Sequence, residues 1–207
     1  MAPQDHLPDD RIAQSVLSGS AYERVRYQRY AFFRQSVPRT LTAQSGILAL
    51  LALTLPMYGL YPESAAALLP ATDPGVASPK AILLAVFGGG MLLLSAALLV
   101  GAGLYRARYS PLTESQAHSV IDVEDFARYV GLGTGALAVV LSVAIFAVGL
   151  GGGGAVGAYL EVTGRNPFVD SGTGVSVQAV ALAAFVASVL LFFVGRYLSV
   201  LLAVTAR

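Results

Sequence analysis

Four long intervals without a charged residue constrain this chain more than any other feature. They cover residues 40–62, 81–105, 129–160 and 171–195. A helix needs about 20 mainly apolar residues to cross the ~30 Å hydrocarbon core of a bilayer, so every interval is long enough. Only 12% of the chain is charged, whereas a soluble domain has about 25% charged residues. The sequence therefore predicts an all-α membrane protein with four transmembrane helices, at about 41–61, 81–105, 129–150 and 175–195.

Proline and glycine predict breaks in two of these spans. Pro56 removes a backbone hydrogen bond and clashes with the preceding turn, so we expect a kink near residues 52–56. The third interval is longer than one crossing needs, and four glycines at 151–154 predict that the span ends near Leu150. Residues 149–154 also match the pattern G-x-G-x-x-G, which indicates a dinucleotide site only between a strand and a helix. We interpret it here as a glycine-rich helix end.

Basic residues are distributed unevenly between the segments that the spans separate. Segments 1–40 and 106–128, with the C-terminal end, carry eleven of the thirteen basic residues, and the other segments carry only Lys80 and Arg165. Short segments rich in Lys and Arg stay on the cytoplasmic side of a membrane. The distribution therefore predicts a multi-pass protein of the cell membrane with both termini in the cytoplasm.

Residues 1–40 are expected to form a cytoplasmic segment distinct from the transmembrane domain, residues 41–207. Within it, Ser20 and Glu23 have the spacing of a capping box, in which each side chain accepts a hydrogen bond from the backbone of the other residue. We expect a helix to begin there and to continue to about Val37, because the proline that follows disfavours the helical conformation of the residue before it.

This N-terminal helix mixes arginines with aromatic rings. Such a composition is typical of an amphipathic helix that lies on the anionic headgroup surface of a membrane, and it also suits docking on an acidic partner. The residues expected to contact the membrane surface or a partner are Arg24, Arg26, Arg29, Arg34, Tyr27, Tyr30, Phe32 and Phe33.

Small residues in the second and third spans predict faces on which helices approach closely. In lipid there is no hydrophobic drive between helices, so close backbone packing through small residues is a main source of association. The second span carries a glycine triplet, and the third carries two sets of small residues spaced by four. The predicted helix-packing residues are Gly88, Gly89, Gly131, Gly135, Gly149, Gly153 and Gly157.

The segment between spans two and three is expected to be a solvated loop with one short helix. Ser110 and Pro111 have the pattern of an N-cap followed by proline, which predicts a helix to about Ser119. The acids of residues 122–125 are then expected to cap the third span. His118 lies among these acids, and we interpret the group as a charged surface and not as a metal site.

No side chain suited to chemistry is expected within the membrane. The predicted spans contain no ionisable residue well inside them, and such residues mark transport or proton-relay sites. The chain has no cysteine, and its two histidines, His6 and His118, lie outside the spans, which disfavours haem ligation in the bilayer. Common hydrolase motifs are absent from the sequence. We therefore predict no enzyme activity, no catalytic or metal-binding residue and no cofactor.

These features favour a non-catalytic subunit that packs and anchors within a larger membrane protein complex, such as an accessory subunit of a respiratory or transport complex. The expected partners are the lipid bilayer and other membrane subunits, in a hetero- or homo-oligomer. A net charge of +1 gives no reason to expect nucleic acid. The alternatives are a small oligomeric transporter or channel for an uncharged or lipophilic solute, and a membrane enzyme or lipid-modifying protein. The Ala, Gly, Val and Arg usage favours a prokaryotic, GC-rich genome.

Overall fold

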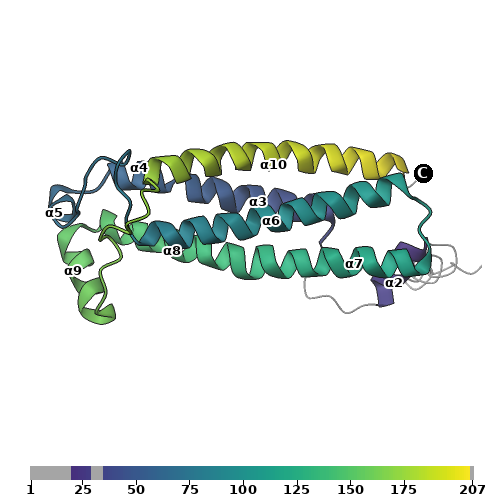
Figure 1. The fold of residues 1–207 in the computed structure, drawn as a ribbon, viewed down its shortest axis with the longest axis horizontal. Helices are drawn as coiled ribbons and strands as arrows, with labels where there is room; N and C mark the ends of the chain where they lie inside the picture. The colour runs from purple at the N-terminus through teal and green to yellow at the C-terminus, as the bar shows by residue number, and fades with distance from the viewer. Residues whose placement is uncertain (1–19, 29–34, 206–207) are drawn as a thin grey trace, which may run out of the picture.

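The computed structural model describes residues 20–28 and 35–205, and this part of the chain folds into a long bundle of helices (Figure 1). Within the described residues, four helices are long and apolar enough to cross a membrane, and no strand is formed. These helices run along the long axis of the molecule. The predicted all-helical fold with four candidate spans is confirmed, and it is compatible with a multi-pass membrane protein.

The first span consists of two helices, α3 (Val37–Ala52) and α4 (Thr54–Gly59). Pro38 lies in the first turn of α3, where its missing N–H needs no partner. Val37 is therefore the first residue of this span. The sequence had predicted it to be the last residue of the preceding helix. The regular helix stops before Leu53 and resumes after it, three residues ahead of Pro56. The predicted discontinuity lies at this place.

The second and fourth spans are uninterrupted helices, α6 (Ala81–Arg108) and α10 (Val177–Thr205). α6 contacts each of the other spans, and α10 packs along α3. Where α3 and α10 cross, the hydroxyls of Ser45 and Ser188 each donate to the backbone carbonyl of the other residue at 2.9 Å. These polar side chains are thus satisfied between helices, which stabilises the crossing in an apolar environment.

The third span is much longer than predicted. α7 (Glu114–Arg128), the π-helix η1 (Tyr129–Gly135) and α8 (Ala136–Leu150) follow one another directly. At 1.5 Å per residue, these 37 residues reach about 55 Å, nearly twice the thickness of a hydrocarbon core. α7 packs along α6. Residues 114–128 therefore belong to the bundle and are not a solvated loop.

The start of α7 corrects two predictions. Thr113 is its N-cap: the Thr113 hydroxyl accepts from the Gln116 N–H at 3.3 Å, and the Gln116 side chain accepts from the Thr113 N–H at 3.0 Å. This complete capping box begins the helix, so the predicted start at Ser110 was wrong. The acids of residues 122–125 lie in the interior of α7, so they do not cap the third span.

The third span ends at the glycine cluster, as predicted. α8 stops at Leu150, and Gly152 has φ +77°, a left-handed conformation that glycine adopts without steric cost. Helix α9 (Gly152–Thr163) then runs crosswise to the bundle and packs against the short helix α5 (Glu63–Ala66). We call this end of the bundle the loop end.

The opposite end, where α6 finishes, carries Arg106 and Arg108, and we call it the arginine end. Helix α2 (Ala21–Gln28) lies there against α7. The predicted capping box of α2 is confirmed, since the Glu23 N–H donates to the Ser20 hydroxyl at 3.4 Å and the Ser20 N–H donates to the Glu23 carboxylate at 3.3 Å.

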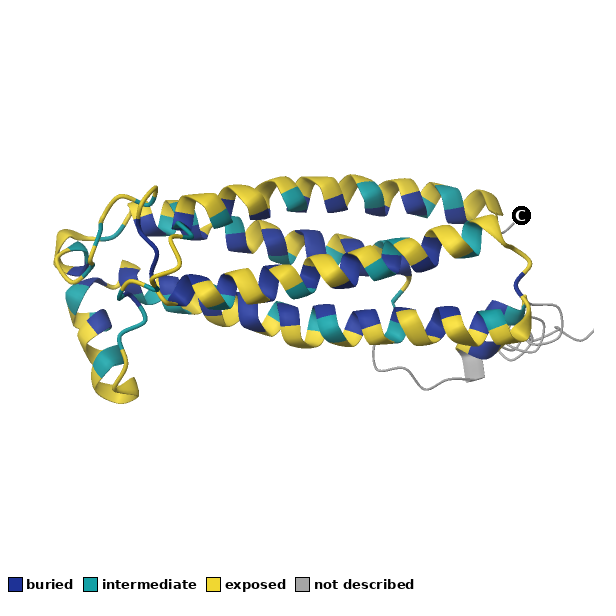
Figure 2. Cartoon of the chain, in the orientation of Figure 1, coloured by how far each residue is buried: buried dark blue, intermediate teal, exposed yellow. Residues whose placement is uncertain are grey.

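Burial divides each long helix into an inward and an outward face (Figure 2). The inward faces form an aliphatic core in which Phe146 is the largest fully buried side chain. The outward faces are also apolar: Leu94, Phe185 and Phe193 are each more than half exposed. Helices that are apolar all round suit a hydrocarbon environment, because a soluble helix has a polar outer face.

Candidate functional site

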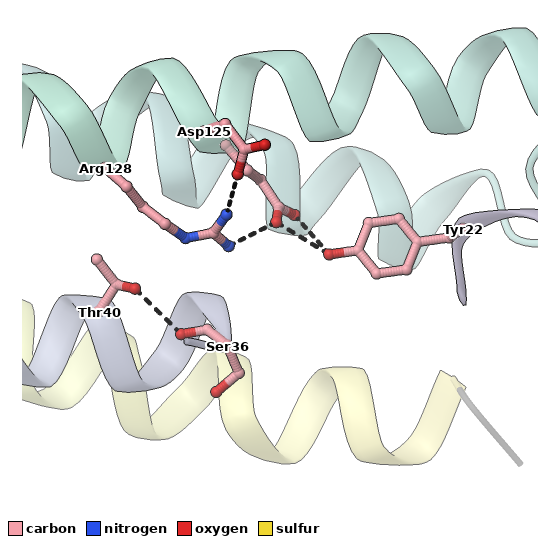
Figure 3. Close-up of polar contacts among 6 residues, drawn as sticks. Tyr22, Ser36, Thr40, Asp125 and Arg128 are labelled. Carbon is pink, nitrogen blue, oxygen red and sulfur yellow. Dashed lines mark hydrogen bonds and ion pairs between the residues drawn. The ribbon is translucent and has the colours of Figure 1, made fainter. Parts of the chain in front are cut away.

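The most unusual feature of the bundle is a buried ion pair in α7. The Arg128 guanidinium donates to the Glu124 carboxylate at 2.7 Å, and their side chains are only 5% and 2% exposed. A second nitrogen of Arg128 donates to Asp125 at 2.8 Å. Figure 3 shows both interactions. Removing a charge from water is expensive, so a buried pair persists only where each charge is neutralised and hydrogen-bonded.

Tyr22 of α2 completes this arrangement. Its hydroxyl donates to the Glu124 carboxylate, with distances of 2.9 and 3.1 Å to the two oxygens (Figure 3). The Arg106 guanidinium lies over the Tyr22 ring, 4.3 Å from its centroid, which is within cation–π range. Burial, together with the nearby Glu124 charge, raises the pKa of Tyr22 to about 12. The hydroxyl therefore stays protonated and remains a donor. We call Tyr22, Glu124 and Arg128 the clamp.

The clamp extends from the arginine end, where Tyr22 contacts Arg106, into the bundle. The carbonyl of Ala127, next to Arg128 in the chain, accepts from the Ser95 hydroxyl at 2.6 Å, and Ser95 is halfway along α6. On the outward face of α7 at this level, Val123 and Phe126 are exposed apolar side chains. Because α7 is part of the third long helix, this helix carries a buried ion pair in the part that the sequence predicted to lie before the span.

A second polar group adjoins the clamp. The Gln44 amide of α3 donates to the Ser95 hydroxyl at 2.6 Å, and Ser95 in turn donates to the Ala127 carbonyl. A Cβ at Gly131, on the same face of the third helix, would overlap the side chains of both Ser95 and Gln44. The π-helix η1 begins directly after the clamp at Tyr129, and π-helical turns are frequent at functional sites. The two polar groups thus join α2, α3, α6 and the third helix at one level.

The glycines predicted to pack helices occupy different environments. Gly88 and Gly135 face each other across α6 and the third helix: a Cβ at Gly88 would lie 2.8 Å from the Gly135 carbonyl oxygen. Gly89 lies beside Leu51 of α3. Gly88 and Gly135 thus lie at a close approach of two backbones, whereas Gly89 and Gly131 face side chains of neighbouring helices.

The other glycine set does not form one continuous face, because the helix breaks between Gly149 and Gly153. A Cβ at Gly149 would overlap the Tyr61 ring, and one at Gly153 would lie 2.7 Å from the Ser64 carbonyl. A Cβ at Gly157 would meet open space. Residues spaced by four share a face only within one continuous helix. The left-handed conformation of Gly152 interrupts the helix between Gly149 and Gly153.

The predicted docking helix packs one of its sides on the bundle. Tyr22 and Val25 are buried in an apolar cluster with Ala117 and Val120 of α7, so α2 turns this side toward the protein and not toward lipid. Arg24 and Arg26 are exposed. The remaining predicted docking residues lie outside the described part of the structure: the side chain of Tyr27, and Arg29, Tyr30, Phe32, Phe33 and Arg34.

The acids that surround His118 in the sequence lie in different environments in the structure. In the described part of the chain, no three His, Cys, Asp or Glu side chains are arranged to hold a metal ion. His118 and Asp122 are exposed on α7, whereas Glu124 is buried in the clamp. The expected charged surface is thus interrupted by an inward-facing acid. The i,i+4 spacing of Glu124 and Arg128 could have indicated an intrahelical pair.

An uncovered groove runs along the outside of the bundle between α6 and α10. Two adjoining hollows of about 270 and 610 Å³ share Leu93, Ala183 and Ala187 as walls. Gly89 and Gly90 of α6 floor the smaller hollow, and a Cβ at Gly90 would meet nothing within 4 Å. We call this feature the α6–α10 groove; its lining is almost entirely apolar.

Comparisons with protein-family models, with characterised proteins and with solved structures gave no match for this chain.

Proposed function

We propose that this protein is a non-catalytic integral membrane subunit that packs and anchors within a larger membrane protein complex. The observation that carries the proposal is the α6–α10 groove. It is floored by small residues and open along the outside of two spans, which is the kind of surface on which a further transmembrane helix can approach closely. The positive-inside distribution favours a cytoplasmic arginine end, the side that the sequence predicts for both termini.

The polar groups of the spans support an anchoring role. Gln44 donates to Ser95, and the Ser142 hydroxyl donates to the Ala81 carbonyl at 3.0 Å, so these side chains bond to the bundle itself. In the clamp, the Arg128 guanidinium pairs with Glu124 and Asp125, while its Nε and the Gln44 Oε1 have no hydrogen-bond partner among the described residues. Polar groups engaged in this way stabilise one arrangement of helices and leave the apolar outside for partners and lipid.

Gentle solubilisation of the full-length protein from its own membrane tests this proposal. We expect a fixed ratio of different membrane subunits to co-purify with it. Gly90→Leu should fill the α6–α10 groove and reduce co-purification. Gly46→Leu is the matched control, because Gly46 is exposed on α3, has the same free space and does not line the groove. A lone homo-oligomer, or equal behaviour of the two variants, would contradict the proposal.

The same groove favours one alternative, a small oligomeric transporter or channel for an uncharged or lipophilic solute. Its apolar walls could hold such a solute as well as a helix. The two functions differ in what occupies the groove, a partner helix or a solute. The alternative also requires a homo-oligomer. If it holds, a lipophilic probe should cross the membrane of proteoliposomes faster with the wild type than with Gly90→Leu.

A further inference from the structure

A second groove lies at the arginine end between α6 and α7. Its volume is about 320 Å³, at the lower end of the range typical of ligand sites. α6 contributes Gly101, Ala102 and Tyr105, and α7 contributes both polar and apolar side chains. We call it the α6–α7 groove. It lies on a different pair of helices from the α6–α10 groove, so a ligand bound in it is independent of the proposed function.

The walls of the α6–α7 groove change from polar to apolar along the helix axes. Ser115, Gln116 and Ser119 line it near the start of α7, and Val120 and Val123 line it further along. On the antiparallel helix, Tyr105 is near the arginine end and Gly101 lies about one turn deeper. The polar walls thus lie toward the end of the bundle, and the apolar walls lie toward its middle. An amphiphile aligned with the membrane normal has the same order.

Arg108 does not line this groove, but its place in the sequence of α6 puts it just beyond the polar end. Arg108 follows Tyr105 by three residues, so it lies on the same face of α6 one turn nearer the end. Its guanidinium is held 5.9 Å from the Tyr109 ring centroid, and the Tyr109 ring packs on Tyr105 with centroids 4.7 Å apart. Arg108 is exposed, and Glu114, the nearest acid in the α7 sequence, does not line the groove.

From this geometry we propose that the α6–α7 groove binds an anionic membrane phospholipid. Arg108 contacts the phosphate, whose oxygens also accept hydrogen bonds from the Ser115 hydroxyl and from the NH₂ of the Gln116 side chain. The Ser119 hydroxyl donates to the Ser115 carbonyl at 3.2 Å and lines the same polar wall. The first part of an acyl chain lies over Gly101, Ala102, Val120 and Val123. A water-filled groove at this depth would leave apolar walls in contact with water, and an acyl chain removes that contact.

Two substitutions distinguish binding of the lipid headgroup from binding of the acyl chain. Gly101→Leu fills the apolar part of the groove, and a Cβ at Gly101 meets nothing within 4 Å. Arg108→Gln removes the charge. Their matched controls are Gly46→Leu, also in open space on α3, and Arg165→Gln at the loop end.

The experiment measures binding of a fluorescent phosphatidylglycerol, and of phosphatidylcholine with the same acyl chains, to the delipidated full-length protein in detergent. We expect Arg108→Gln to weaken phosphatidylglycerol binding about fivefold, the equivalent of the ~1 kcal/mol that one arginine contributes beside an anionic membrane surface. Wild type should bind phosphatidylcholine more weakly than phosphatidylglycerol. Gly101→Leu should abolish saturable binding of both lipids, and the two controls should bind as wild type does.

Equal binding of the two lipids by wild type would overturn the anionic headgroup, and wild-type binding by Gly101→Leu would overturn the site itself. Thermal unfolding in lipid-free detergent verifies that each variant is folded. If Gly101→Leu does not fold, Val123→Trp replaces it, since Val123 is exposed on α7 and lines the apolar part of the same groove.

Discussion

The hydroxyl of Tyr22 lies 2.9 Å from the carboxylate of Glu124, although 102 positions separate the two residues in the chain. This hydrogen bond ties the helix that precedes the first span to the inner part of the third. Because Glu124 also accepts from Arg128, one carboxylate joins α2 to the bundle and neutralises a buried charge. The consequences of this contact can be tested directly.

Tyr22→Phe should release α2 with little change in the four long helices. The substitution keeps the ring and its contact with Arg106 but leaves a buried carboxylate with one donor fewer, which costs about 1–3 kcal/mol. Hydrogen exchange of residues 21–28 should become faster, while exchange in α6 stays slow. Unchanged exchange in α2 would show that apolar packing of Val25 suffices to hold it.

Raising the pH should release α2 as well. Burial raises the pKa of Tyr22 to about 12 from its ordinary value of 10.0. The folded state therefore keeps this proton where the unfolded state loses it, so stability declines as the pH rises from about 10 to about 12. An ultraviolet difference titration of wild type against Tyr22→Phe isolates this tyrosine. A difference spectrum that titrates near 10 would contradict a buried hydroxyl bonded to a carboxylate.

Arg128→Met should be strongly destabilising, because it leaves Glu124 buried without its cation. The expected loss in unfolding free energy is about 3–5 kcal/mol. Replacing both partners, with Glu124→Leu and Arg128→Met together, should restore much of that loss. Denaturant unfolding in detergent of the two single variants and the double variant measures the coupling. Strictly additive effects would mean that the two residues do not act as a pair.

Gly88→Ala and Gly90→Ala form a matched test of the close helix crossing. Both residues lie in α6, so the gain in helix propensity is the same. A Cβ at Gly88 would lie 2.8 Å from backbone atoms of the third helix, whereas one at Gly90 meets open space. Gly88→Ala should therefore lose about 1–3 kcal/mol of stability, and Gly90→Ala should be neutral or stabilising. Equal thermal unfolding of the two variants would exclude a tight contact at Gly88.

The orientation is testable because the chain has no cysteine. Glu114→Cys at the arginine end and Thr173→Cys at the loop end introduce single thiols at exposed positions. With an impermeant thiol reagent on intact cells, we expect labelling of the residue at 173 and protection of the residue at 114 until the membrane is opened. The reverse pattern would invert the proposed topology.

The sequence alone was sufficient for the architecture wherever a local property decides the outcome. The charge-free intervals predicted four long apolar helices, because span length and apolar composition are properties of a single segment. The break at Gly151–Gly152, the discontinuity ahead of Pro56 and the capping box of Ser20 and Glu23 follow from backbone rules that act within a few residues.

The candidate site depended on contacts that no local pattern contains. Counting charges placed Glu124 and Arg128 in a solvated loop, because a charge is interpreted as an end of a span when its partner is unknown. In the fold, α7 continues the third helix, so Glu124 turns inward to meet Arg128 one turn away and Tyr22 from a distant segment. A buried charge is tolerable only when such partners are present. The sequence by itself determined four apolar helices and their breaks, and tertiary packing decided which polar residues lie between them.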